Sequence, residues 1–67
     1  MILKINNRTE DINLLSPNIS KLLECKNIAL SGTAVALNNK LIRHSEWDTT
    51  SLNEGDELTI ISAAFGG

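Results

Sequence analysis

Residues 16–27 read SPNISKLLECKN, and this stretch decides the fold because it holds the one helix that the sequence predicts. Pro17 ends the extended segment before it, and the side-chain oxygen of Asn18 is suited to cap a helix. The helix is expected to end by Asn27. Its apolar side chains recur at the spacing of a single buried face: Ile19, Leu22 and Leu23.

Strand patterns lie on both sides of this helix. Alternating or β-branched residues predict five extended segments, at residues 1–6, 11–15, 33–38, 41–42 and 58–62. Three groups rich in Asn, Asp or Gly are suited to the turns between them: Asn6-Asn7, Asn38-Asn39-Lys40 and Glu54-Gly55-Asp56. One helix packed on one face of a mixed sheet of four to five strands buries both apolar surfaces, so the predicted class is α+β.

Length and composition exclude several classes of protein. A chain of 67 residues has room for one domain, which we expect to span residues 1–67. The net charge is −2 and the six basic residues are scattered, which disfavours nucleic-acid binding. No apolar run approaches the ~20 residues that span a membrane. The opening MILKI lacks the anatomy of a signal peptide, and one cysteine forms no internal disulfide, so we expect a reducing cytoplasm.

Side chains for catalysis are scarce. His44 is the only histidine and Cys25 is the only cysteine, so no His/Cys cluster has the spacing of metal ligands. No glycine-rich loop opens a helix, so the chain has no phosphate-binding loop of its own. We therefore expect a protein that is not an enzyme and that binds no metal or cofactor.

The C-terminal residues carry the most distinctive chemistry. Gly66 and Gly67 follow a predicted strand directly, and residues 63–67 are expected to form a flexible tail. Glycine has no Cβ, so such a tail enters a narrow channel easily. The Gly67 carboxylate is an anion at neutral pH and a poor acyl donor until it is activated, for example as a mixed anhydride with AMP. A sulfur donor that displaces AMP would leave a C-terminal thiocarboxylate.

The chain resembles the ThiS family, the sulfur carriers of thiamin (thiazole) biosynthesis, over essentially its whole length. Five segments carry the resemblance: MILKIN at 1–6, NISKLLE at 18–24, VALNNKLIRHSEW at 35–47, EGDELTII at 54–61 and FGG at 65–67. Many members of the family have Pro-Arg just before the Ser-Glu-Trp stretch, where this chain has Arg43 and His44. This departure leaves position 44 without an assigned role.

The resemblance implies a ubiquitin-like β-grasp fold, with the first and last strands parallel in the centre of the sheet. It also implies a protein cosubstrate. An adenylating, E1-like activating enzyme consumes ATP to activate Gly67, and recognises the tail at Gly66 and Phe65. A cysteine desulfurase or a rhodanese-type donor supplies sulfur, and a thiazole synthase takes it from the thiocarboxylate.

Two alternatives stay open. The first is a ubiquitin-like carrier of another pathway, such as the small subunit of molybdopterin synthase or a carrier for tRNA thiolation. The residues before the tail, Ser62-Ala63-Ala64-Phe65, lack the Pro-Pro that is typical of the molybdopterin carrier. The second alternative is a binding module whose tail is chemically inert.

Four side chains each allow a functional and a structural interpretation, and one surface is a candidate for partner binding. Phe65 either docks in the activating enzyme or folds back onto the sheet, and the sequence favours neither. Trp47 is expected to pack on the sheet edge rather than to anchor a partner. Cys25 is expected to be a buried, inert core residue rather than a persulfide relay. His44 is expected to be a surface residue with no role in the site. An exposed apolar patch around the last strand, Val35 and Leu37 would be a partner-binding face.

Overall fold

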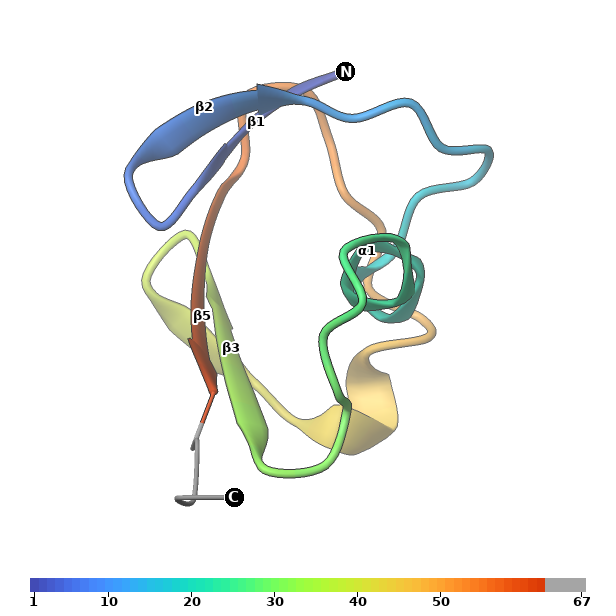
Figure 1. Cartoon of the computed structure of the whole chain (residues 1–67), viewed down its shortest axis with the longest axis vertical. Coiled ribbons are helices and arrows are strands. Elements are labelled where there is room, and N and C mark those ends of the chain that lie inside the picture. The colour runs from blue at the N-terminus through green and yellow to red at the C-terminus, as the bar shows by residue number, and fades with distance from the viewer. Residues whose placement is uncertain (63–67) are drawn as a thin grey trace.

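The computed structural model describes residues 1–62 of the chain (Figure 1). Within these residues it has five β-strands, one α-helix and one short 3-10 helix. In chain order they are β1 (Ile2–Ile5), β2 (Arg8–Asp11), α1 (Ile19–Cys25), β3 (Thr33–Leu37), β4 (Lys40–Ile42), the 3-10 helix η1 (His44–Glu46) and β5 (Glu57–Ser62).

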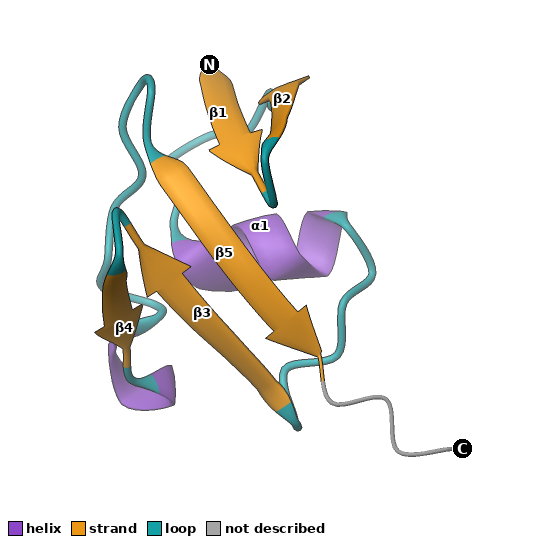
Figure 2. Cartoon of the chain, turned by 90° about the vertical axis from the view of Figure 1, so that its left-hand side faces the viewer, coloured by secondary structure: helices purple, strands orange, loops and turns teal. Residues whose placement is uncertain are grey.

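The five strands form one mixed sheet in the order β2-β1-β5-β3-β4. The last strand, β5, therefore lies in the centre, parallel to β1 on one side and antiparallel to β3 on the other. Figure 2 shows α1 crossing behind β5, on one face of the sheet. This is the β-grasp arrangement, and it confirms the predicted α+β sheet with a single helix.

The position predicted for the second strand was wrong. It was expected near residues 11–15, but β2 occupies Arg8–Asp11. The reason lies in the turn: Asn6 and Asn7 both have positive φ, at 50° and 67°. Two successive residues of this kind make a type I′ hairpin turn, which starts the next strand at once. A matching turn at Asn38-Asn39 places Lys40 already inside β4.

The boundaries of α1 follow from its two caps. The Asn18 side chain accepts a hydrogen bond of 2.8 Å from the backbone N–H of Lys21, as the sequence predicted for an N-cap. At the other end Asn27 takes a φ of 57°, and the N–H of Ile28 donates to the Leu23 carbonyl at 2.9 Å. This is a Schellman cap, which ends the helix where it was expected to end.

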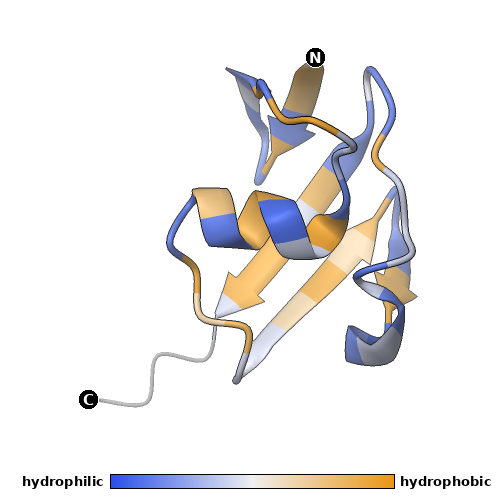
Figure 3. Ribbon diagram, turned by 90° about the vertical axis from the view of Figure 1, so that its right-hand side faces the viewer, coloured by the Kyte–Doolittle hydropathy of each residue, from blue (hydrophilic) through white to orange (hydrophobic). Residues whose placement is uncertain are grey.

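The core lies between α1 and the sheet. Ile19, Leu22 and Leu23 are fully buried, which confirms the predicted helix face. Figure 3 shows the predominantly apolar β3 and β5 behind the helix. The remaining core residues come from the strands and from the connections between elements: Leu3, Ile5, Val35, Leu58 and Ile60, with Ile12, Trp47 and Leu52.

Trp47 closes the core beside β4. Its side chain is 2% exposed, and its indole Nε1–H donates to the Ile42 carbonyl at 3.0 Å. A tryptophan buried in this way packs against the sheet and satisfies its only polar group. This confirms the prediction that it holds the sheet edge, and it excludes Trp47 as an exposed anchor for a partner.

Candidate functional site at the end of the central strand

The predicted site residues Phe65, Gly66 and Gly67 lie outside the described residues, as does the whole predicted tail 63–67. Their roles therefore stay predictions. The structure does describe the element that leads to them. Ser62 is the last residue of β5, so the chain enters the tail directly from the central strand of the sheet.

The pairing around β5 is longer on one side than on the other. The antiparallel pairing with β3 continues to the end of the strand, where Thr33 lies opposite Ser62. The parallel pairing with β1 ends earlier, at the pair formed by Ile5 and Leu58. Beyond that point the side chain of Asn6 takes over: its Nδ2 donates to the Ile60 carbonyl at 3.2 Å, and its Oδ1 accepts from the Ile60 N–H at 2.7 Å.

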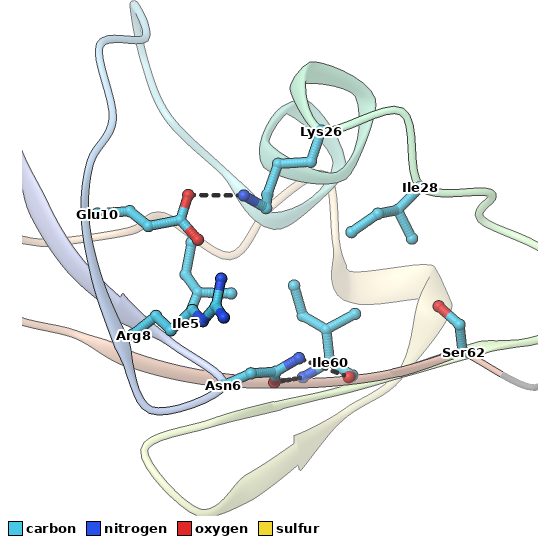
Figure 4. A pocket seen from close by; sticks show the side chains of 8 residues that line it. All are labelled: Ile5, Asn6, Arg8, Glu10, Lys26, Ile28, Ile60 and Ser62. Carbon is cyan, nitrogen blue, oxygen red and sulfur yellow. Dashed lines mark hydrogen bonds and ion pairs between the residues drawn. The ribbon is translucent and has the colours of Figure 1, made fainter.

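A cleft opens beside this end of β5, on the face that carries the helix (Figure 4). One wall holds an ion pair in which Lys26 Nζ lies 2.6 Å from the Glu10 carboxylate. The other lining residues are Ile5, Asn6, Arg8, Ile28, Ile60 and Ser62. Because Ser62 lines the cleft, the cleft adjoins the point at which residues 63–67 begin.

The opposite face of the sheet carries no helix within residues 1–62, and apolar side chains are exposed there. Ile61 of β5 is 63% exposed and Leu41 of β4 is 71% exposed. The pairing of the strands puts Ala34 beside Ile61 and Ala36 beside Leu41. We call these four residues the open-face patch. An exposed apolar patch of this kind is a typical protein-binding surface.

This patch corrects part of the prediction. The predicted surface included Val35 and Leu37, but Val35 is fully buried and Leu37 packs against the core. Successive residues of a strand point to opposite faces of the sheet, so their neighbours Ala34 and Ala36 line the open face instead. The prediction that Val35 and Leu37 share one side of the strand is correct, but that side faces the helix and not solvent.

The prediction that Cys25 is buried was also wrong, because its thiol is exposed. Each helical residue turns by about 100°, so position 25 lies well to one side of the face formed by Ile19, Leu22 and Leu23. His44 is exposed, as expected, but it is not free of contacts. Its Nε2 lies 2.7 Å from the Thr33 carbonyl, and its ring stacks on Trp47 with centroids 4.0 Å apart.

The acidic residues before β5 shape the backbone rather than form a site. Asp56 accepts a hydrogen bond of 2.8 Å from the Asn53 N–H across a turn in which Gly55 has a φ of 83°. This confirms Asp56 as a turn residue. Glu54 accepts from the Ile2 N–H at 2.8 Å. In the part of the chain that the structure describes, no group of three or more His, Cys, Asp or Glu residues is arranged to hold a metal ion.

Neither of the helices within residues 1–62 has the length and apolar character needed to cross a membrane.

Comparison with known proteins identifies the family. The model of the ThiS family matches residues 5–67, which is nearly the whole chain and includes both C-terminal glycines. The chain belongs to the ThiS family. Comparison with curated protein sequences gives no match.

Two solved structures from Geobacter metallireducens are similar to this ThiS-family chain. One is a crystal structure of the thiamine biosynthesis protein ThiS, with 23% sequence identity and a TM-score of 0.84 over 100% of both chains. The other is an NMR solution structure of a thiamine biosynthesis protein, with 25% identity and a TM-score of 0.85 over 100% of this chain and 88% of that chain. Both support the β-grasp fold.

The two hydrogen bonds between the Asn6 side chain and the Ile60 backbone could not be predicted from the sequence. Asn6-Asn7 was correctly predicted as a turn, and that role alone accounts for an asparagine there. The side-chain contact joins residues 54 positions apart, and no local pattern signals a contact of that separation.

Proposed function

We propose that this protein is a sulfur carrier of thiamin biosynthesis and serves as a protein cosubstrate rather than as an enzyme. The observation that carries the proposal is the ThiS-family match, which extends from residue 5 to Gly67. The match therefore includes the diglycine on which carrier chemistry depends. It favours the thiamin pathway over the molybdopterin and tRNA-thiolation alternatives.

The proposed reaction takes place at the Gly67 carboxylate. In an activating enzyme, a carboxylate oxygen attacks the α-phosphorus of ATP and pyrophosphate leaves, which gives an acyl adenylate. The donor protein carries the sulfur as a cysteine persulfide, whose terminal sulfur attacks the acyl carbon as AMP leaves, which gives an acyl disulfide. A second thiol then attacks the sulfur of the donor cysteine, so that a disulfide forms, the S–S bond to the carrier breaks and the carrier sulfur is released. The product is a C-terminal thiocarboxylate, whose sulfur passes to a thiazole synthase. ATP is consumed in the partner's site, and the carrier itself holds no cofactor.

This chemistry requires that the end of the tail carry no bulky side chains. Gly66 and Gly67 carry no side chains, so the activating enzyme encloses the reacting carboxyl group within a narrow channel. Phe65 precedes them and supplies an apolar side chain for recognition in a pocket of that enzyme. The sulfur donor is a cysteine desulfurase or a rhodanese-type protein, and the reactions take place in the cytoplasm.

The open-face patch is the proposed docking surface for the activating enzyme. Ile61 lies on β5 itself, so a partner that receives the tail passes directly over this side chain. Leu41 extends the apolar surface across the neighbouring strands. Docking here orients the carrier through its rigid sheet and leaves residues 63–67 to enter the active site.

Intact-mass spectrometry tests the proposal. The protein is incubated with ATP, the activating enzyme of the same organism and a sulfur source. We expect a mass gain equal to the difference between sulfur and oxygen. Deletion of Gly67 should abolish the gain and leave the melting temperature unchanged, because a short segment after the last strand adds little buried surface.

The control is a carrier already known to be activated under the same conditions by its own enzyme. If the control gains sulfur and this chain does not, the tail is inert and the binding-module alternative holds. If the melting temperature falls sharply on deletion of Gly67, the C-terminal residues belong to the folded body, and their proposed role as a free tail is wrong.

A further inference from the structure

Two asparagines hold the central strand from opposite sides. Leu58 of β5 is flanked by Ile5 of β1 and by Leu37 of β3. Directly after each of these two neighbours, the chain leaves the sheet through an Asn-Asn turn. Asn6 begins the first turn and Asn38 begins the second, and both have a φ of 50°. The two residues thus have the same φ, and each directly follows a residue that pairs with Leu58.

They bond different parts of β5: Asn6 bonds its middle and Asn38 bonds its first residue. The backbone N–H of Asn6 donates to the Leu58 carbonyl at 2.9 Å, and its side-chain amide bonds both polar backbone groups of Ile60. Figure 4 shows these two side-chain bonds as dashed lines. The amide replaces the peptide group that a longer β1 would have offered. Because β1 and β5 are parallel, this contact lies towards the end of β5 from which the tail leaves.

Asn38 makes an equivalent contact with the first residue of β5. Its backbone N–H donates to the Glu57 carbonyl at 2.8 Å, and its Oδ1 accepts from the Glu57 N–H at 3.0 Å. Its Nδ2 donates to an Asp56 carboxylate oxygen at 3.1 Å. Since β3 and β5 are antiparallel, this contact lies at the start of β5, far from the tail.

We propose that Asn6 is a positioning residue for activation of Gly67, an inference that rests on the proposed function. Ile61 and Ser62 are exposed and are not fixed by the core. On the β3 side they pair with Ala34 and Thr33, whereas on the β1 side the last hydrogen bond to β5 within residues 1–62 comes from the Asn6 amide. Asn6 therefore fixes the direction in which β5 delivers the tail to the activating enzyme.

Position matters because the reacting carboxyl group lies only a few residues beyond Ser62. A displacement of ~1 Å at a reacting centre lowers a rate by as much as ~100-fold. Asn6 lines the cleft, on the face of the sheet that carries the helix, and is not part of the open-face patch. Ile61 of that patch keeps its pairing with Ala34 of β3, so loss of the Asn6 amide should impair the chemical step more than docking.

The test compares Asn6→Gly with Asn38→Gly. Glycine accepts the positive φ at both positions, so each variant loses its side-chain bonds without backbone strain. Urea unfolding should show similar losses of stability. Adenylation is measured as ATP–pyrophosphate exchange by the activating enzyme, with the carrier concentration varied. For Asn6→Gly we expect kcat to fall by ~10-fold or more with KM within ~2-fold, whereas Asn38→Gly should keep both within ~2-fold.

Amide hydrogen exchange provides a readout that does not depend on the enzyme. Asn6→Gly should accelerate exchange at the Ile60 amide, and Asn38→Gly should accelerate it at the Glu57 amide. If Asn6→Gly does not fold, Asn6→Asp replaces it; if Asn38→Gly does not fold, the wild-type protein is the reference. Aspartate at position 6 keeps the acceptor for the Ile60 N–H and loses only the amide donor, so a smaller fall in kcat in the same direction is expected.

Equal kcat values for the two variants would overturn the role of Asn6, as would a rise in KM alone for Asn6→Gly. Both results presuppose that the wild-type carrier is adenylated. If the wild-type protein supports no exchange while a control carrier does, the proposed function itself fails and the role of Asn6 fails with it.

Discussion

Replacing Leu22 with alanine removes a side chain from the centre of the contact between α1 and the sheet. Leu22 is 0% exposed and belongs to the apolar helix face. The change deletes the equivalent of roughly three methylene groups at ~0.8 kcal/mol each, or ~2.4 kcal/mol of transfer free energy. The cavity left behind adds to this, so the expected loss is ~2–5 kcal/mol.

That loss is large for this protein. A chain of 67 residues at ~0.05–0.15 kcal/mol per residue has a free energy of unfolding of ~3–10 kcal/mol. Leu22→Ala therefore removes between about a fifth of the free energy of unfolding and all of it. With a urea m-value of ~1 kcal/mol/M for so small a domain, the unfolding midpoint should fall by ~2 M or more.

The assay is urea unfolding followed by far-ultraviolet circular dichroism, with sucrose added if the variant is unfolded in buffer alone. Leu15→Ala is the matched control, since Leu15 is 90% exposed and the same substitution there should cost less than ~0.5 kcal/mol. Equal midpoints for the two variants would show that Leu22 does not pack against the sheet, and the assignment of the core would be wrong.

Two further predictions concern contacts outside the helix face. Trp47→Phe keeps an aromatic ring but leaves the Ile42 carbonyl without its indole donor, so it should cost ~1–3 kcal/mol in urea unfolding. A loss below ~0.5 kcal/mol would mean that this hydrogen bond contributes nothing. Glu10→Gln removes the charge that pairs with Lys26, and because both side chains are partly exposed the loss should stay below ~1 kcal/mol and shrink in added salt. A loss that does not change with salt would contradict an electrostatic origin.

The two hairpins show which features near the site follow from local sequence and which depend on the tertiary structure. Both Asn-Asn turns could be predicted, because asparagine tolerates positive φ and interrupts two apolar strands. The consequence for β2 was missed, since a two-residue turn leaves no linker and starts the next strand at Arg8. The side-chain bonds from these turns to β5 could not be predicted, because they depend on strands that are far apart in the sequence.

The open face is a similar case. Alternation in residues 33–38 predicted a strand with one buried side, and β3 at Thr33–Leu37 confirms it. Which side is buried depends on the face of the sheet that α1 covers, so Val35 was assigned to the wrong surface. For Cys25 the helical period alone would have indicated an exposed position, and the general tendency of cysteine to be buried was misleading.

The sequence by itself determined the local elements: the Asn18 cap, the helix face of Ile19, Leu22 and Leu23, the Asn-Asn turns and the diglycine on which the proposed chemistry rests. Each depends on residues within one turn or one face, where backbone preferences and apolar spacing act directly. Only the tertiary structure decided that β5 lies between β1 and β3 and that Asn6 holds Ile60. Those contacts join distant segments, and they depend on the register of the sheet rather than on local backbone preferences.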